Sequence, residues 1–338
     1  MIMTNRILAL LTIAIAVTFL KILSGCAPTT RANCESDADQ LDTDVSNTEE
    51  QSEETLEDEN TQVEPELLPP INLESETENA RAFLLTRGSM DPEDEVIFYW
   101  KGEIFLISPP EPTVSPSSDF RAPDFFFEGF NIGRFVPTSG GTRMITREIT
   151  VYKNSAGRII NCWFSPWSGE TLRVMHVAND PVNFTIGSAD YDRMLDRVVF
   201  KVNVSLDYPS PLPMDQYPDY STGNTYQSTE LFNFYVSEMD LRDPNAVTVP
   251  VDISWSRVGQ PLPWMQIDPS EGVNMVYHSR GRKMLEGFEG LPEDLKLFVR
   301  DNFPEYEHPP ASDLSPNETS WKRFKRLVDE GSYQPQCD

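Results

Sequence analysis

Regular alternation of apolar and polar residues is the feature that most constrains what this 338-residue chain can fold into. Every second residue from Val198 to Leu206 is apolar, and the same pattern runs from Val247 to Trp255. Because successive side chains of a strand point to opposite faces, this alternation predicts strands with one buried and one wetter face. Pro250 has no N–H to donate, so we expect the second strand to be an edge strand or to carry a bulge.

Short apolar segments separated by turn signals extend this pattern along the chain. The connections are brief and rich in turn residues, as in Ser139-Gly140-Gly141 and Asn179-Asp180-Pro181, and they favour antiparallel hairpins. The further strands expected are 96–107, 124–136, 143–152, 158–164, 171–177, 182–186, 228–237 and 272–282. With about ten strands, the prediction is a mostly β fold, an antiparallel meander that forms a lipocalin-like barrel or a sandwich.

Long loops and two C-terminal helices complete the expected domain. The Pro- and Ser-rich loops 109–123 and 207–227 are expected to fold over an opening of the β structure. One helix should begin at Pro292, with acidic residues in its first turn. The other should open at Ser315 with the spacing of a capping box and end at Gly331. Both helices are expected to pack on the sheet.

Charge divides the chain and excludes one class of partner. The chain has 54 acidic and 27 basic residues, a formal charge of −27, and so has no electrostatic route to a nucleic-acid backbone. Residues 27–79 hold 17 of these acids and a single base. A segment of this composition cannot bury enough apolar surface to offset its ordering entropy. We therefore expect an acidic disordered linker over 26–79 and a single β-rich domain over 80–338.

The first 25 residues are typical of an export signal. The apolar run 7–20 follows Arg6 and is followed in turn by Leu23-Ser24-Gly25-Cys26, which resembles the bacterial lipobox, where the cysteine is lipidated. Cys26 is then the lipid attachment site, and Ala27 after it favours the outer membrane. The expectation is an extracytoplasmic lipoprotein that faces the periplasm. A signal segment retained as a membrane anchor is the alternative.

Several short segments together resemble one known family. They are Phe130–Phe135, Asn161–Trp163, Pro166–Glu170, His176–Asn183, Ile253–Trp255, Pro263–Met265, Tyr277-His278 and Pro316–Trp321. On these segments the chain is similar to the family catalogued as domain of unknown function 1838, over about residues 80–330. The resemblance covers the whole expected domain, but it implies no catalytic or binding residue, because the family has no assigned activity.

Two of the three histidines fall in predicted strands. If His176 and His278 point into one cavity, with Asp180 orienting one of them, they would form a general acid and a general base. A hydrogen-bonded histidine in the wall of the β structure is the favoured interpretation. No His or Cys pair has metal-site spacing, so no metal is expected.

Arg147 is a further candidate because it lies in an otherwise apolar strand row. There it needs either a carboxylate partner, which is the favoured interpretation, or a polar ligand. Arg280 shares the face of His278 and is a second candidate for binding an anionic group. Trp163 is a candidate apolar wall of a binding site, although core packing uses aromatic residues in the same way.

Three cysteines remain if Cys26 is lipidated. Cys34 lies in the linker and Cys337 is next to last, so neither is expected to form a structural bridge. Cys162 is expected to be a buried thiol. The sequence contains no nucleophile elbow, phosphate-binding glycine loop or dinucleotide motif, and no cofactor is expected. The oligomeric state stays open.

Three functions follow from these features. The leading one is an exported, lipid-anchored protein that binds a small, partly apolar molecule inside its β structure. Its polar groups there would be Arg147, His176, His278 and Arg280. The second is a cofactor-free enzyme of the hydratase, dehydratase or cyclase type, in which the two histidines transfer protons. The third is a structural envelope lipoprotein without a pocket.

Overall fold

The computed structural model describes residues 69–109, 122–139, 141–180, 182–312 and 318–337. The chain divides into two units, Met1–Val63 and Glu64–Asp338, and every described residue belongs to the second. The expected signal segment, Cys26 and most of the expected linker therefore lie outside the described residues, as does most of loop 109–123. Among the helices that are described, none has the length and apolar character needed to cross a membrane.

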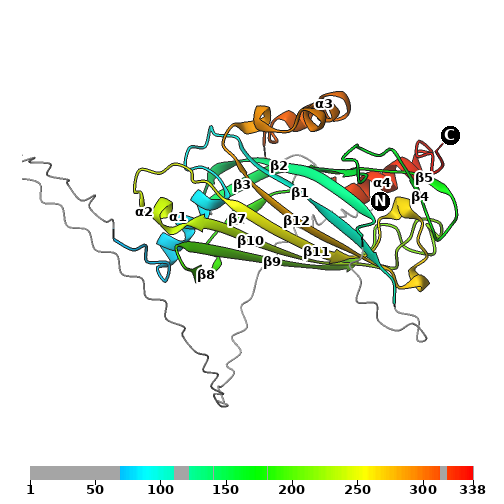
Figure 1. Cartoon of the computed structure of the whole chain (residues 1–338), viewed down its shortest axis with the longest axis horizontal. Coiled ribbons are helices and arrows are strands. Elements are labelled where there is room, and N and C mark those ends of the chain that lie inside the picture. Colours follow the sequence, from blue (N-terminus) through cyan, green and yellow to red (C-terminus); the bar gives the residue numbers. More distant parts are fainter. Residues whose placement is uncertain (1–68, 110–121, 140, 181, 313–317, 338) are drawn as a thin grey trace, which may run out of the picture. The chain divides into compact units, whose positions relative to one another are not determined.

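Ten strands form one antiparallel sheet in the order β6-β3-β2-β1-β12-β11-β10-β9-β8, with β7 also paired to β3 (Figure 1). A separate hairpin pairs β4 with β5. Within the described part of the chain, the end strands β6 and β8 are not paired with each other. The strands are β1 (Val96–Ile107), β2 (Phe125–Thr138), β3 (Gly141–Lys153), β4 (Cys162–Phe164), β5 (Thr171–Arg173), β6 (Val177–Asn179), β7 (Phe184–Ile186), β8 (Asp190–Met194), β9 (Arg197–Pro209), β10 (Thr225–Ser237), β11 (Asp252–Gly259) and β12 (Asn274–Met284).

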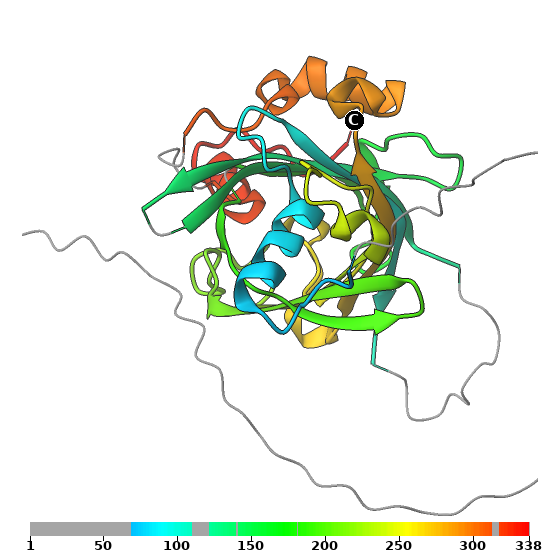
Figure 2. The same ribbon diagram turned by 90° about the vertical axis from the view of Figure 1, so that its left-hand side faces the viewer.

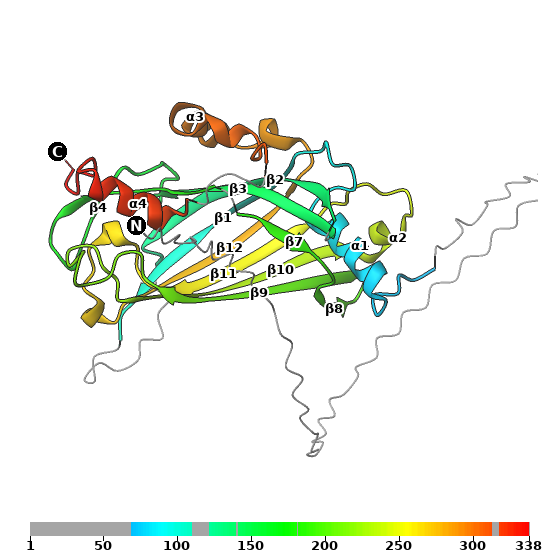
Figure 3. The same cartoon turned by 180° about the vertical axis from the view of Figure 1, so that it is seen from behind.

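Helices cover both sides and both ends of the sheet. Figures 1 and 3 show α1 and α2 at one end of the strands and α4, with β4 and β5, at the other. The helical segments are α1 (Glu76–Arg87), α2 (Glu238–Arg242), η1 (Pro263–Met265), η2 (Pro269–Glu271), η3 (Gly287–Gly290), α3 (Glu293–Asn302), η4 (Pro304–Glu307) and α4 (Ser320–Asp329).

The mostly β architecture predicted from the alternation is confirmed, and β1 has the predicted bounds. The strand predicted from Val247 to Trp255 is wrong in its first half, because β11 begins at Asp252. Val247 is 51% exposed, and its carbonyl accepts a hydrogen bond from the Met90 N–H outside the sheet. Pro250 lies in this excluded segment, where it has no N–H for a strand partner. The alternation there is therefore not that of a paired strand.

The concave side of the curved sheet holds the larger core, and α1 packs into it. Figure 2 shows α1 within the curve of the strands. Phe83 of α1 contacts Phe200 of β9 and Phe234 of β10, with ring centroids 5.4 and 6.3 Å apart. This helix was not predicted, and its first residues belong to the segment expected to be linker. Ser75 caps it, and its buried residues are spread around the helix rather than confined to one stripe.

The convex side carries a second apolar core beneath α3, η3 and η4. Leu295 and Val299 of α3 pack there against Ile97, Phe130 and other residues of β1, β2 and β3. The start of α3 directly after Pro292 agrees with its prediction. As a result, both sides of β1, β2 and β3 are covered.

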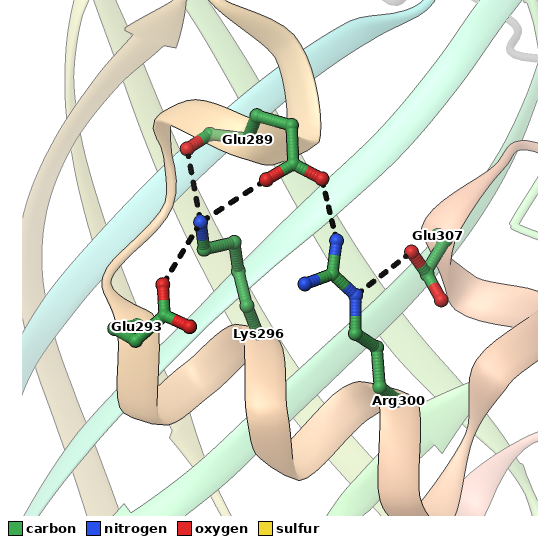
Figure 4. A network of polar contacts seen from close by, with 5 residues as sticks. All are labelled: Glu289, Glu293, Lys296, Arg300 and Glu307. Carbon is green, nitrogen blue, oxygen red and sulfur yellow. Dashed lines mark hydrogen bonds and ion pairs between the residues drawn. The ribbon is translucent and has the colours of Figure 1, made fainter.

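The exposed side of α3 carries a network of ion pairs, which Figure 4 shows in detail. Lys296 lies 3.1 Å from Glu289 and 3.0 Å from Glu293, and Arg300 lies 3.1 Å from Glu307. Each exposed pair of this kind contributes only about 0–1 kcal/mol to stability. The Glu289 and Glu293 side chains of this network are exposed, whereas Lys296 is buried beneath them.

The second predicted helix begins later than its sequence suggested. α4 starts at Ser320, because the side chain of Thr319 accepts a hydrogen bond from the Lys322 N–H and caps the first turn. The capping box expected at Ser315 falls mostly on residues outside the described part, and Glu318 instead pairs with Asp180 in an isolated β-bridge. Phe324 of α4 is buried against the concave core, as the apolar stripe predicted.

A disulfide joins Cys162 of β4 to Cys337, across 175 residues of sequence. This corrects both the expected absence of a bridge and the expected buried thiol, since Cys162 is exposed. The backbone brings the two residues together, because the Cys337 N–H donates to the Thr171 carbonyl and Leu172 forms an isolated bridge with Gln336. A bridge across a long loop typically stabilises a fold by about 2–4 kcal/mol.

Candidate functional site

Neighbouring residues of β3 point to opposite sides of the sheet, and this separates Arg147 from Glu148. Tyr152, four residues beyond Glu148, lies in the concave core. Ile149, two residues beyond Arg147, lies in the convex core. Because strand side chains alternate, Glu148 faces the concave side and Arg147 the convex side.

Arg147 has the ion-pair partner that its apolar row required. Its Nε lies 2.8 Å from Asp180 Oδ2, and its guanidinium also donates to the carbonyls of Glu305 and, at 3.2 Å, His308. These contacts fix the η4 segment to β3. Asp180 therefore pairs with Arg147. Among the described residues, no hydrogen bond joins Asp180 to a histidine.

His176 is buried at the edge of β3. Its Nδ1 accepts a hydrogen bond of 3.2 Å from the Tyr152 N–H, and its ring lies edge-on to Phe298 of α3, 5.0 Å between centroids. Burial, together with the positive charge of Arg323, lowers the pKa of His176 to about 4. The ring is therefore neutral near pH 7. Its Nδ1 serves as the acceptor for a backbone N–H at the edge of β3.

The structure does not bring His176 and His278 together. His278 and Arg280 are exposed on the convex side of β12, where His278 Nδ1 lies 3.2 Å from Ser256 Oγ. β2 and β1 stand between β3 and β12 in the sheet order. Three inter-strand spacings amount to about 14 Å. The expected proton transfer between these two histidines therefore has no geometric basis.

Trp163 belongs to an aromatic cluster at the α4 end of the concave core. Its ring centroid lies 5.4 Å from that of Phe125 and 5.9 Å from that of Trp264. The side chain is half-buried, so it keeps some accessible surface beside these rings. Trp163 therefore packs with the aromatic residues of the concave core.

A polar cluster lies among the aromatic residues of the concave side, and we call it the concave cluster. Arg257 of β11 donates to the Tyr226 hydroxyl at 2.9 Å and lies 3.6 Å from Glu230 of β10. Trp255 Nε1 donates to the second oxygen of Glu230 at 3.2 Å. The members of the concave cluster are Glu148, Tyr226, Glu230, Arg257 and Tyr277.

Tyr277 contacts both Arg257 of this cluster and Tyr152 of β3. Its hydroxyl lies 3.1 Å from that of Tyr152, and the Arg257 guanidinium stands over its ring at 5.2 Å from the centroid. Burial raises the pKa of Tyr277, so its hydroxyl keeps its proton. Tyr277 can therefore act as a hydrogen-bond donor within the cluster.

Glu148 is the member with the fewest protein partners. Asn179 Nδ2 donates to its Oε1 at 3.2 Å, and no other hydrogen bond to this carboxyl is found among the described residues. Burial first, and the negative charge of Glu230 second, raise the pKa of Glu148 to about 7. Four strands separate β3 from β10 in the sheet order, so this repulsion acts across the concave side. Glu148 and Glu230 are both half-buried.

Glu230 and Arg257 were not predicted from the sequence, although a signal was present. Glu230 interrupts the inward row of β10 between Ser228 and Phe232, and Arg257 continues the inward row of β11 after Trp255. A charged residue in an apolar row of a strand needs a partner or a ligand. Applied to every strand, the reasoning used for Arg147 would have found both residues.

The concave cluster can exchange a proton and hold hydrogen-bonding groups beside aromatic surface. With a pKa of about 7, Glu148 can donate or accept a proton near neutral pH. No group of three or more His, Cys, Asp or Glu side chains that could hold a metal ion is found in the described part of the chain.

A comparison of the sequence with models of known families finds a match. The model of the family described as protein of unknown function (DUF1838) matches residues 93–328, from the strand β1 into α4. No curated protein matches the chain in sequence.

Proposed function

The chain belongs to the DUF1838 family, and we propose that it is an exported, lipid-anchored protein that binds a small, partly apolar molecule. The ligand occupies the concave side of the sheet, which serves as an incomplete barrel with α1 inside it. Its polar group meets the concave cluster, and its apolar part meets the surrounding rings.

One observation carries this proposal, namely that Glu148 is buried deeply enough for its pKa to rise to about 7 and yet has one weak partner. A buried polar group normally has its hydrogen bonds satisfied by the protein. A carboxyl that lacks them, and that keeps accessible surface, is a natural acceptor for a ligand hydroxyl or amine. Glu148 therefore supports a binding site better than a solid core.

Partly exposed apolar side chains surround the same side of the sheet. Phe232 and Trp255 stack with ring centroids 6.0 Å apart, and Val202 is paired in register with Phe232. All three are half-buried although they belong to the concave core. Aromatic walls with a few placed polar groups are the usual composition of a small-molecule site.

Mass spectrometry under native conditions, on the full chain extracted from its own host in mild detergent, tests the binding function. We expect a bound mass that is lost on denaturation and reduced in the Glu148→Gln variant. A titration with the neutral fluorescent probe N-phenyl-1-naphthylamine gives an independent readout. If neither a bound mass nor probe binding is found, the structural envelope lipoprotein becomes the better account.

Export and lipid anchoring rest on the sequence of residues 1–26 and are supported by the disulfide. Structural disulfides persist in oxidising compartments and are rare in the cytosol, and Cys162 is bonded to Cys337. Labelled palmitate should enter the wild type and not the Cys26→Ser variant, which should leave the membrane fraction. Labelling of that variant at the wild-type level would contradict the assignment of Cys26.

Acid–base catalysis at the same site is a second candidate function, because burial and the negative charge of Glu230 raise the pKa of Glu148 to about 7. Two carboxyls held in different environments can divide the roles of acid and base. If the protein turns over its ligand, the wild type and Glu148→Gln should co-purify with different masses. Identical masses in both proteins would favour binding alone.

A further inference from the structure

Arg87, the last residue of α1, is a further charged group on the concave side. Its guanidinium carbon lies 4.8 Å from the ring centroid of Phe98, 4.7 Å from that of Phe234 and 5.4 Å from that of Phe184. These rings belong to β1, β10 and β7. The charge is therefore held between the walls of the curved sheet, at the end covered by α1.

Among the described residues, no acidic side chain forms an ion pair with Arg87. A guanidinium has five N–H donors, and the acceptor found for Arg87 within the described residues is Met144 Sδ, at 3.7 Å. Burial lowers the pKa of Arg87 to about 10. The side chain is half-buried, so part of it stays accessible. Arg87 thus combines an unsatisfied charge with accessible surface.

The neighbouring cation, Lys283 of β12, is in a different situation. Its Nζ donates to the carbonyls of Leu85 and Gly88, at 2.6 and 3.0 Å, and to Thr248 Oγ1 at 3.0 Å. These bonds satisfy the last carbonyls of α1 and offset the negative end of the helix. Lys283 is therefore used to hold α1 in place, while burial and the nearby Arg87 lower the pKa of its amine.

Arg147 and Arg257 differ from Arg87, because both have structural partners within the protein. Arg147 is bonded to Asp180 at 2.8 Å, and Arg257 lies 3.6 Å from Glu230. Each is accounted for by a carboxylate of the protein itself. For Arg87 the phenylalanine rings supply cation–π attraction, and no oxygen acceptor for its N–H donors is found in the part of the chain that the structure describes.

We propose that Arg87 binds the carboxylate of the ligand, so that the protein recognises small apolar carboxylic acids; this rests on the proposed binding function. A planar guanidinium matches a carboxylate with two parallel hydrogen bonds. The apolar chain of the acid would lie against Phe98 and Phe234. Met144, which Arg87 contacts, and Glu148 both face the concave side of β3 four residues apart, or about 13 Å along the strand. A ligand of about this length could reach both ends of the site.

Binding of cis-parinaric acid and of its methyl ester to the full chain, followed by fluorescence, tests this assignment. The two probes share one apolar chain and differ in the charge that Arg87 would bind. We expect the wild type to bind the acid about 10- to 100-fold more tightly than the ester, from the usual strength of hydrogen bonds to charged groups. Arg87→Met should abolish this preference and leave binding of the ester unchanged.

Arg81→Gln is the matched control, because Arg81 lies in the same helix and its guanidinium donates to the carbonyls of Asp243 and Pro244. It should keep the preference for the acid. Equal binding of acid and ester by the wild type would overturn the assignment while leaving the binding function standing, and this comparison needs no variant. An Arg87→Met variant that binds both probes more weakly by the same factor would also overturn the assignment. If the wild type binds neither probe, the binding function itself fails together with the assignment.

Discussion

Arg147 and Glu148 are neighbours in β3, yet they belong to two very different environments. On the convex side, Arg147 is paired with Asp180, and Lys153 is paired with both Glu128 and Asp294. On the concave side, Glu148 has no cation within ion-pair distance in the described part of the chain. Both sides contain many buried residues, so burial alone does not mark a site. Charge that is buried and left unpaired distinguishes the concave side.

The largest expected effect comes from breaking a pair on the convex side. Lys153 and Glu128 are both buried, and Asp294 lies 2.7 Å from Lys153 Nζ. Lys153→Met should lower the free energy of unfolding by about 3–5 kcal/mol, because it leaves the Glu128 carboxylate buried without its cation. Urea unfolding of the two proteins measures this loss.

The matched control removes both charges. A Glu128→Leu and Lys153→Met double variant should recover most of the lost stability, since replacing a buried pair by apolar residues is often close to neutral. A loss below about 1 kcal/mol in Lys153→Met alone would show that the convex pairs are not structural and would erase the contrast between the two sides.

A smaller effect of opposite sign is expected at Glu148. Its pKa is raised to about 7 in the folded protein, chiefly by burial, against about 4.3 for an unfolded glutamate. As pH rises from about 4 to about 7, the unfolded chain releases this proton before the folded protein does, so the free energy of unfolding falls. Glu148→Gln removes the titration and should gain up to about 3 kcal/mol relative to the wild type over that range.

Urea unfolding of both proteins at several pH values between about 4 and about 8 tests this sign. A difference between variant and wild type that stays constant over the range would mean that Glu148 ionises as an ordinary surface glutamate. In that case the carboxyl is not a desolvated acceptor, and the observation behind the binding site is lost.

The smallest effects are expected at His278 and Arg280, which are exposed on the convex side. His278→Ala and Arg280→Ala should each change stability by no more than about 0.5 kcal/mol, as surface substitutions usually do. Probe binding should also be unchanged. A loss of binding in either variant would indicate that the ligand binds on the convex face of β12.

Much of the fold could be predicted from the sequence because alternation and turn residues act locally. β1 was predicted from residue 96 to residue 107 and observed over the same residues. α1 was missed because it is buried on most of its sides and follows an acidic segment, so no single apolar stripe identified it. The bond between Cys162 and Cys337 depends on a C-terminal segment that returns to β5, which no local pattern specifies.

The candidate site was predicted less well, for a related reason. Alternation shows that Arg147 and Glu148 face opposite sides, but it does not tell which side is the interior. Arg147 shares its row with apolar residues because α3, more than a hundred residues later, covers the convex side as well. The choice between the two rows therefore depended on tertiary packing that the sequence pattern does not contain.

A matched pair of substitutions in β9 tests the central claim most directly. Val202 faces the concave side, where it is paired in register with Phe232, and its neighbour Asn203 is exposed on the other face. In titrations with N-phenyl-1-naphthylamine, Val202→Trp should fill the site and weaken binding at least about 10-fold, by the volume added to a packed interior. Asn203→Trp should bind the probe as the wild type does. Wild-type binding by Val202→Trp, or an equal loss in both variants, would contradict a ligand site on the concave side.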